Sequence, residues 1–234
     1  MKVKKHPQRN SYKTLIVPSV RHLSSLFVFL FTSSFPAYAV LQEVTTIPIT
    51  FADWCFNKTR ESVQTQLTVD LLLQEAKTTD CHQASELLST RTELSLVSNQ
   101  ITDLRPLSTL TNLTTLDLSN NQIADLTPLS NLTKLAYLDL GGNQIADLKP
   151  LSTLTSLISL IVFDNQIADL KPLSTLTNLS QLLLNDNQIA DLIPLSNLTN
   201  LTELSLYNNP SLTNKTCPVK PESICIFVPF QSEV

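Results

Sequence analysis

Residues 113–134 read LTTLDLSNNQIADLTPLSNLTK, and residues 135–156 repeat the same order in LAYLDLGGNQIADLKPLSTLTS. The repetition continues in both directions with a fixed period of 22 residues, from Arg91 to Asn209. Each unit contains Leu-x-x-Leu-x-Leu-x-x-Asn, followed by Gln-Ile-x-Asp-Leu-x-Pro-Leu. Self-similarity at a constant period of this length indicates a stack of equivalent structural units, each of which contacts only its neighbours.

The pattern within one unit is typical of a leucine-rich repeat, in which each unit forms one turn of a solenoid. Apolar residues alternate in the Leu-x-x-Leu-x-Leu part, which is the period of a strand with one buried face. In the fourth unit Val162 replaces a strand leucine, and a β-branched residue suits that position. The sequence therefore predicts an α/β solenoid, a leucine-rich repeat horseshoe with a concave parallel sheet and about six units over residues 91–209.

The second half of each unit predicts a short 3₁₀ turn on the convex side. An Asp precedes a Pro by three residues in five units, at Asp103, Asp125, Asp147, Asp169 and Asp191. An Asp carboxylate accepts backbone N–H groups at a helix start, and Pro is tolerated in the first turn. About five residues are available, which suits a 3₁₀ turn better than an α-helix. Calcium ligation is the alternative role for these aspartates, but the Gly-rich nonapeptide of such repeats is missing, so we expect no metal.

One Asn recurs in every unit, at Asn99, Asn121, Asn143, Asn165, Asn187 and Asn209. The chain turns at this point, and an Asn amide can both donate and accept hydrogen bonds to the backbone of neighbouring turns. Burial of such a side chain is acceptable only when it is hydrogen-bonded. We therefore expect a structural Asn ladder; a polar ligand site is the alternative, although one Asn per turn favours the ladder.

The first 39 residues predict a secretion signal. A basic segment precedes the apolar run Leu26–Phe31, and Ala37-Tyr38-Ala39 provides a small-x-small cleavage pattern. The apolar run is far shorter than the ~20 residues that a spanning helix needs, so we expect no stable membrane insertion. Residues 40–50 would form a linker between the signal and the folded part.

Cleavage after Ala39 would change the charge of the protein. It lowers Lys plus Arg from 16 to 10 while Asp plus Glu stay at 20, so the formal net charge falls from −4 to −10. Nucleic acid and anionic membrane surfaces would both be repelled. The acidity would instead keep an elongated protein soluble.

Four cysteines flank the repeats: Cys55 and Cys81 precede them, and Cys217 and Cys225 follow. Three pairings are possible in principle. Six stacked strands would place the two ends roughly 25 Å apart, whereas a disulfide needs Cα atoms within about 7 Å. The sequence therefore predicts the pairs Cys55–Cys81 and Cys217–Cys225. The same separation argues against a zinc site with four thiolates.

Both ends of the solenoid need a cover, because terminal units otherwise expose the core. We expect a helical N-terminal cap over residues 51–90 and a C-terminal cap and tail over residues 210–234. Val63, Leu67 and Leu71 recur every four residues, with Leu72 and Ala76 alongside, which predicts an amphipathic helix. A second short helix would follow it with three buried residues, Ala84, Leu87 and Leu88.

The unit Asn-Gln-Ile-x-Asp-Leu-x-Pro-Leu-x-x-Leu-Thr-Asn resembles the 22-residue repeat of the internalin family. The flanking segments resemble the caps of secreted leucine-rich repeat proteins found in cyanobacteria, and they run from Ala52-Asp53-Trp54-Cys55 to Asp80-Cys81 and from Cys217-Pro218 to Ile224-Cys225. The resemblance covers nearly all of residues 51–226 and implies a protein–protein interaction module. It does not extend to the wall anchor of some internalins, because Phe227 to Val234 contains no apolar tail or sorting motif.

The x positions of the strands should face the concave side and form columns from unit to unit. Most are small or polar, but five carry large side chains: Tyr137, Ile161, Phe163, Leu183 and Tyr207. Exposed apolar clusters mark interaction sites, and aromatic residues dominate binding hot spots. Our hypothesis is that these five residues, rimmed by Asp139, Asp164, Asp186 and Glu203, form the centre of a protein-binding surface. Sequence drift in one degenerate repeat is the alternative.

No residue pattern points to catalysis or to a cofactor. After cleavage the single histidine is His82, which lies beside a cysteine that we expect to be oxidised. The carboxylates recur once per unit and so follow the repeat, and no glycine-rich phosphate loop exists. Gly141 and Gly142 are the two glycines of the chain, and we interpret them as turn variation, although a glycine also permits close approach of another backbone. We expect a monomeric protein without enzymatic activity.

Three function classes remain open. The first is a secreted scaffold, periplasmic or extracellular, that mediates protein–protein interaction through its concave face. The second binds carbohydrate or a cell-envelope polymer, with Tyr137, Phe163 and Tyr207 as stacking platforms. The third is a structural or adhesive surface component. The apolar Ile161–Leu183 pair favours a protein ligand, because sugar sites need polar hydrogen-bonding groups beside their aromatic residues.

Overall fold

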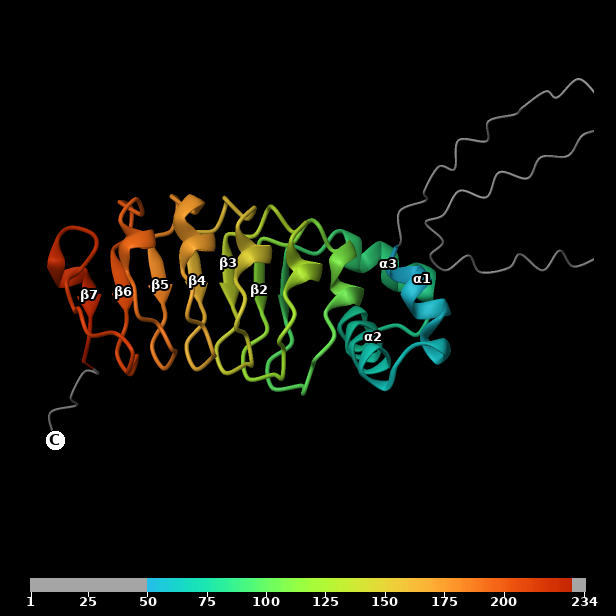
Figure 1. The fold of residues 1–234 in the computed structure, drawn as a ribbon. Helices are drawn as coiled ribbons and strands as arrows, with labels where there is room; N and C mark the ends of the chain where they lie inside the picture. The colour runs from blue at the N-terminus through green and yellow to red at the C-terminus, as the bar shows by residue number, and fades with distance from the viewer. Residues whose placement is uncertain (1–49, 229–234) are drawn as a thin grey trace, which may run out of the picture. The chain divides into compact units, whose positions relative to one another are not determined.

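The computed structural model describes residues 50–228. The predicted signal, most of the predicted linker and the last six residues of the tail lie outside the described residues. The described part contains three α-helices followed by seven parallel strands that alternate with 3₁₀ helices (Figure 1). The solenoid that the 22-residue period predicts is confirmed, with its parallel sheet and its short 3₁₀ turns.

The seven strands form one sheet in chain order, so every strand lies beside its sequence neighbours. They are β1 (Glu93–Ser95), β2 (Thr115–Asp117), β3 (Tyr137–Asp139), β4 (Ser159–Ile161), β5 (Gln181–Leu183), β6 (Glu203–Ser205) and β7 (Cys225–Ile226). From β1 to β6 each residue pairs with the residue 22 positions later, for example Leu116 with Leu138. The pairing of the strands therefore follows the 22-residue period of the sequence.

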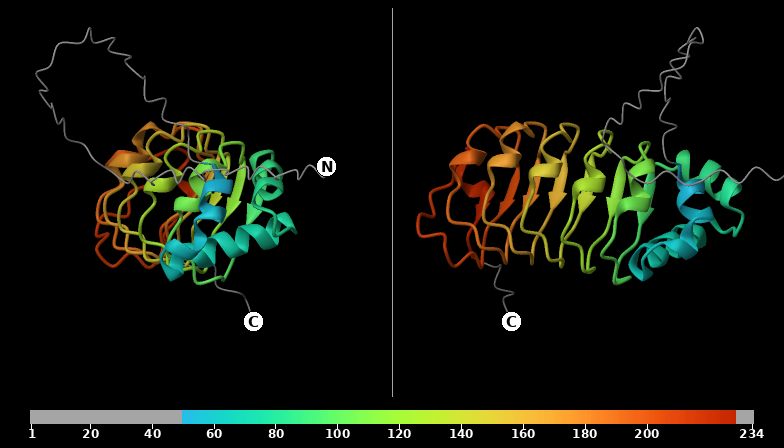
Figure 2. Two further views of the ribbon diagram at one scale, coloured as in Figure 1. Left: turned by 90° about the vertical axis from the view of Figure 1, so that its right-hand side faces the viewer. Right: turned by 45° about the vertical axis from the view of Figure 1, so that its right-hand side comes forward.

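The strands and 3₁₀ helices stack coil by coil along the solenoid (Figure 2), and columns of leucine and isoleucine side chains form its core. The central strand residues Leu116, Leu138 and Leu160 are fully buried, as are Ile123 and Ile145 from the following segments. Burial of one such side chain contributes roughly 1.5–3 kcal/mol. Because all units contribute equivalent residues, the solenoid has one continuous core.

The 3₁₀ helices of the repeats are η2 (Arg105–Thr109), η3 (Thr127–Leu129), η4 (Lys149–Leu151), η5 (Lys171–Thr175) and η6 (Ile193–Leu195), and each has Pro in its first turn. The Asp that precedes each helix accepts a hydrogen bond from the backbone N–H two residues later, at 2.8 to 3.0 Å. The aspartates thus satisfy N–H groups that a helix start leaves without partners.

The residue before each ladder Asn lies in the left-handed region, with φ between 49° and 67°. These six residues are Ser98, Asn120, Gly142, Asp164, Asp186 and Asn208. Gly, Asn and Asp adopt this conformation more readily than other residues. Gly142 is therefore a turn residue. The recurrence of such residue types every 22 positions marks this turn in the sequence.

The cap contains α1 (Phe51–Phe56), η1 (Lys58–Arg60), α2 (Val63–Ala76) and α3 (Cys81–Ser89). The predicted helix is α2, in which Leu72 and Ala76 are buried together with Thr65, Thr68 and Val69. Val63 does not belong to the buried face, because it is 78% exposed, and the predicted burial of Leu87 is wrong, since it is 45% exposed. The apolar spacing could not show that two threonines of α2 contact the first repeat.

A polar network joins α2 to the first repeat. The hydroxyl of Thr65 donates to the Asp103 carboxylate at 2.7 Å, and the hydroxyl of Thr68 donates to the Asp103 carbonyl at 2.8 Å. The Arg105 guanidinium also donates to the Asp103 carboxylate at 2.7 Å and lies 5.4 Å from the centre of the Trp54 ring. Burial acts to raise the pKa of Asp103, but hydrogen bonds from Arg105 and Thr65 outweigh it, so the pKa is lowered.

Both predicted disulfides are confirmed. Cys55 and Cys81 join α1 to α3 with a Cα separation of 5.5 Å, and Cys217 and Cys225 join the C-terminal segment to β7 with a separation of 5.7 Å.

The seventh strand was not predicted. It follows the 3₁₀ helix η7 (Glu222–Ile224) and pairs with β6 at an offset of 21 residues, with Leu204 opposite Cys225, so it lies outside the repeat pattern.

Candidate functional site

The five predicted binding residues, which we call the concave patch, lie on β3 to β6 or directly after these strands. Ile161 pairs with Leu183 across β4 and β5, and Tyr137 starts β3. Phe163 follows β4. Its carbonyl accepts the N–H of Gly142 at 3.0 Å, and the N–H of Asp164 donates to the carbonyl of Asn185 at 3.0 Å, so Phe163 lies between Gly141 and Asn185. The N–H of Asp186 donates to the carbonyl of Tyr207 at 3.0 Å, which places Tyr207 next to Asn185 in the same column.

Strand β4 differs from β2, β3 and β5 because all three of its residues are buried. Ile161 is 9% exposed, although it does not belong to the cluster of residues that forms the solenoid core. Its neighbours on the concave side therefore cover most of it. Tyr137, Phe163, Leu183 and Tyr207 are half-buried and keep part of their surface open to solvent.

Gly141 makes room for the ring of Phe163. A Cβ atom at Gly141 would lie 2.4 Å from Cε1 of Phe163 and 2.7 Å from its Cζ, which is far inside the contact distance. Turn variation therefore explains Gly142 but not Gly141. The glycine lets the aromatic ring lie against the backbone of the neighbouring coil, and this contact fixes the position of Phe163 in the concave patch.

A row of polar side chains runs beside the concave patch along the first column of β4 to β6. The hydroxyl of Ser159 donates to Oε1 of Gln181 at 2.6 Å, and Nε2 of Gln181 donates to Glu203 at 2.8 Å. These groups are hydrogen-bonded to one another across three strands. They therefore support the shape of the surface and have less capacity left for a polar ligand.

Two aspartates occupy neighbouring positions on β2 and β3, where Asp117 pairs with Asp139. Asp117 accepts hydrogen bonds from the N–H and hydroxyl of Ser119, and Asp139 accepts one from the N–H of Gly141 at 2.9 Å. Burial raises the pKa of Asp139 and so does the charge of Asp117, while the hydrogen bonds from Gly141 and Tyr137 partly oppose this shift. Burial also raises the pKa of the Tyr137 hydroxyl, as do the charges of both aspartates.

The substitution Asp139→Asn is expected to raise the melting temperature at about pH 7 and to lose this effect towards about pH 3. The pKa of Asp139 is raised in the folded state, so the protonated carboxyl group stabilises the folded protein. This stabilisation is complete below the ordinary Asp pKa of 3.8 and is lost as the pH rises through the pKa that Asp139 has in the folded protein. An Asn at this position keeps an acceptor for the N–H of Gly141. Thermal unfolding at the two pH values measures the effect.

The matched control for this comparison is Asp125→Asn, which removes the same charge from an exposed turn. It should not reproduce the pH-dependent gain. A variant Asp139→Asn that unfolds at a lower temperature than the wild type at neutral pH would contradict the explanation.

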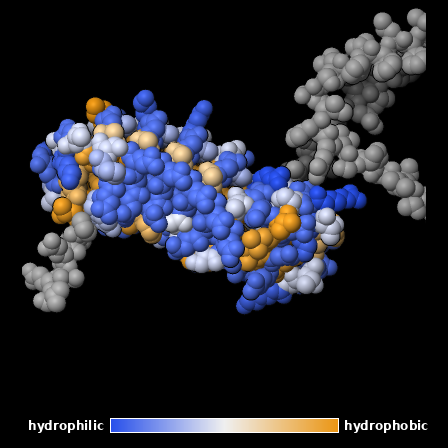
Figure 3. Space-filling model, turned by 60° about the horizontal axis from the view of Figure 1, so that its bottom comes forward, coloured by the Kyte–Doolittle hydropathy of each residue, from blue (hydrophilic) through white to orange (hydrophobic). Residues whose placement is uncertain are grey.

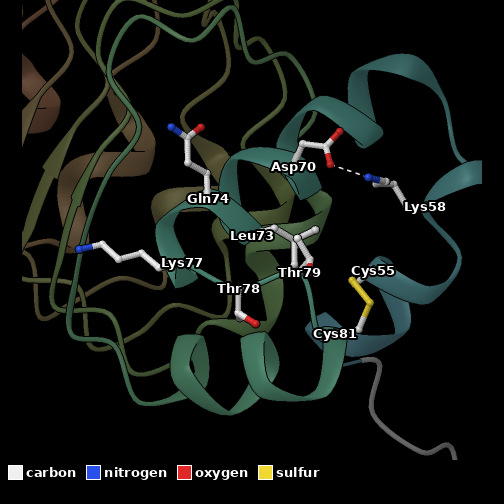
Figure 4. Close-up of a pocket in the computed structure, with 9 residues that line it drawn as sticks. All are labelled: Cys55, Lys58, Asp70, Leu73, Gln74, Lys77, Thr78, Thr79 and Cys81. Atoms are coloured by element: carbon white, nitrogen blue, oxygen red, sulfur yellow. Dashed lines mark hydrogen bonds and ion pairs between the residues drawn. A yellow bond between two sulfur atoms is a disulfide. The ribbon is translucent and has the colours of Figure 1, made fainter.

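The cavities of residues 50–228 offer no arrangement typical of catalysis. An open groove of about 930 Å³ in the cap is lined by the Cys55–Cys81 disulfide and by the Lys58–Asp70 ion pair, with Lys77 at its far side (Figure 4). His82 is exposed and packs edge-on against Phe56 with ring centres 4.9 Å apart. Within the described range no three His, Cys, Asp or Glu side chains are grouped to hold a metal ion.

The lower side of the solenoid, which faces the viewer in Figure 3, is polar over the repeats. Figure 3 shows mostly hydrophilic side chains over the repeats on this side, and apolar side chains gathered over the cap. The large exposed apolar residues of the cap are Phe56, Val63 and Leu87. No helix within residues 50–228 combines the length and the apolar character that crossing a membrane would require.

Comparisons with known proteins agree with the fold. The family model for leucine-rich repeats in two copies matches residues 92–131 and 133–175, whereas the search of curated proteins found no match. The solved functional domain of InlJ from Listeria monocytogenes, described as including a cysteine ladder, is 27% identical with a TM-score of 0.58, over 70% of this chain and 34% of that one. A leucine-rich repeat protein of Leptospira interrogans is 30% identical with a TM-score of 0.50, over 54% and 33% of the two chains.

Internalin C2 from Listeria monocytogenes is 48% identical with a TM-score of 0.49, and the match covers 50% of this chain and 52% of that chain. The chain thus spans about half the length of internalin C2 and about a third of the other two proteins. Leucine-rich repeat proteins typically bind protein partners. Taken with the parallel sheet and the 3₁₀ turns, the matches identify the chain as a leucine-rich repeat solenoid with internalin-like structural neighbours.

Proposed function

We propose that this chain is a secreted leucine-rich repeat scaffold that binds another protein through the concave face of its sheet. The observation that carries the proposal is the concave patch, in which five large side chains gather on adjacent coils outside the solenoid core. A soluble protein seldom presents such a group without a partner. Trp, Tyr and Arg are enriched among binding hot spots, and two of the five residues are tyrosines.

Two contacts favour a protein ligand over a carbohydrate. The ring of Phe163 lies against Gly141, so part of its surface is unavailable as a stacking platform. The polar groups in the same column as Tyr137, which are Ser159 and Gln181, already bond to each other and to Glu203. A sugar would therefore find these three hydrogen-bonding groups already occupied.

The location that we propose is the periplasm or the cell exterior, with the chain acting as a monomer after removal of residues 1–39. The two disulfides support an oxidising compartment, because such bonds are rare in the cytosol. The basic and apolar segments before Ala39 support export. The resemblance of both flanks to caps of secreted cyanobacterial proteins agrees with this location.

The double substitution Phe163→Ser and Tyr207→Ser is expected to weaken capture of the partner from cell-envelope extract about 30-fold or more. Both side chains contribute open apolar surface to the concave patch, and neither belongs to the solenoid core. The measurement is a pull-down with the purified chain, followed by quantification of the bound protein. The circular dichroism spectrum of the variant should match that of the wild type.

The matched control is Phe56→Ser, which removes an aromatic side chain that is 58% exposed on the cap. This variant should capture as much protein as the wild type. Equal capture by the concave double variant would reject the concave patch as the binding surface. Release of the bound material by glycosidase treatment would instead favour a carbohydrate ligand.

A further inference from the structure

We infer that the concave patch takes a cationic protein segment as its partner. Lys or Arg side chains of that segment would meet the Asp117–Asp139 pair, while its apolar side chains would cover Ile161 and Leu183. The inference rests on the proposed function, because it specifies the partner chemistry of the same surface. It is carried by the distribution of charge over the sheet and by the order of residues along one column.

The concave side of the repeats carries charge of one sign. The strands β1 to β6 and the three residues after each contain six acidic residues, which are Glu93, Asp117, Asp139, Asp164, Asp186 and Glu203. The same segments contain no Lys and no Arg. The basic residues of the repeats lie elsewhere: Arg105, Lys149 and Lys171 are in 3₁₀ helices, Lys134 donates to Asn112 at 2.6 Å, and Arg91, before β1, forms an ion pair with Glu75 at 3.4 Å.

Asp117 and Asp139 stand at one register on adjacent strands, which lie about 4.8 Å apart. Like charges at this separation repel each other. Neither carboxylate belongs to an ion pair within residues 50–228, and their hydrogen-bond donors are neutral groups of Ser119, Gly141 and Tyr137. A guanidinium or ammonium group placed over the pair would offset the repulsion, whereas an acidic partner would increase it.

The acidic pair and the apolar pair lie in the same column. Asp117 pairs with Asp139, Asp139 pairs with Ile161, and Ile161 pairs with Leu183. Two strand spacings, or roughly 10 Å, separate the centres of the two pairs. In a polyproline II segment, residues three positions apart point to the same side and lie about 9 Å from each other. One short segment can therefore place a cation over the aspartates and an apolar side chain over Ile161 and Leu183.

The charge and apolar requirements can be tested separately with labelled peptides. The first probe contains tandem copies of Arg-Ser-Ser-Leu, which puts each Arg three residues before a Leu. The second replaces every Arg with Glu, and the third replaces every Leu with Ser. Fluorescence anisotropy with the purified chain should show that the first peptide binds about tenfold or more tightly than the other two, and that salt weakens this binding.

Two double variants locate the charge requirement. Asp117→Asn with Asp139→Asn should weaken binding of the Arg/Leu peptide about tenfold. The matched control is Asp125→Asn with Asp147→Asn, which removes the same net charge from exposed turns outside the sheet and should bind like the wild type.

Several results would overturn the inference: no binding of the Arg/Leu peptide, equal binding of the Glu/Leu or the Arg/Ser peptide, or an equal loss in the control variant. The proposed function has a separate readout in Phe163→Ser with Tyr207→Ser. If envelope protein is still lost from this variant while the Arg/Leu peptide fails to bind the wild type, protein binding stands and the cationic partner is rejected. If this variant behaves like the wild type in both assays, the proposed function itself fails.

Discussion

The substitution Asn187→Ala is expected to lower the free energy of unfolding by about 3–5 kcal/mol, because one side chain satisfies several buried backbone groups. Its Oδ1 accepts the N–H of Ile167 at 2.9 Å, and its Nδ2 donates to the carbonyls of Val162 at 2.9 Å and Leu184 at 3.2 Å. The residue is only 4% exposed, so water cannot replace these bonds. Urea denaturation followed by circular dichroism measures the loss.

Asn99 provides the matched control, because it occupies the first rung of the ladder. Its Nδ2 donates to the carbonyl of Val97 at 2.9 Å, and its side chain accepts no hydrogen bond from an earlier residue of the described range 50–228. The substitution Asn99→Ala should therefore cost about 1 kcal/mol. Similar losses for both substitutions would show that the bonds between coils do not determine the stability of the ladder.

Removal of the Cys55–Cys81 disulfide by substitution of both residues with Ser is expected to lower the free energy of unfolding by about 3.5 kcal/mol. The bond closes a loop with a sequence separation of 26 residues, which restricts the unfolded chain. The Cys217–Cys225 bond closes a loop of only 8 residues, so its removal should cost about 2.5 kcal/mol.

The two Ser double variants serve as controls for each other, since both remove a bond that pins a cap. Their midpoints of urea denaturation should both lie below that of the wild type, and the N-terminal variant should have the lower one. A larger loss for the C-terminal pair would contradict the loop-length explanation.

The sequence predicted the sheet well because its period carries geometric information. A constant interval between equivalent leucines implies strand pairing at the same interval, and Leu138 indeed lies between Leu116 and Leu160. The same reasoning put Ile161 next to Leu183, because residues at equal positions of consecutive coils must be neighbours. The disulfide pairs followed from the length of the stack between them.

Other features could not be predicted from apolar spacing. The face that α2 buries depends on hydrogen bonds from Thr65 and Thr68 to Asp103, a residue more than thirty positions away in the sequence. The role of Gly141 depends on a ring from the next coil, and a glycine by itself does not reveal which group fills the space. Strand β7 interrupts the period by one residue, so no repeat pattern could contain it.

The ladder bonds have a short range, and this has a consequence for the length of the protein. Each Asn side chain from Asn121 to Asn209 connects its own coil only to the preceding one, through partners 20 and 25 residues earlier. Deletion or duplication of one complete internal unit would leave every rung with an equivalent partner. The number of internal units therefore determines the length of the sheet, which can be increased or decreased by whole units without a change to either end of the chain.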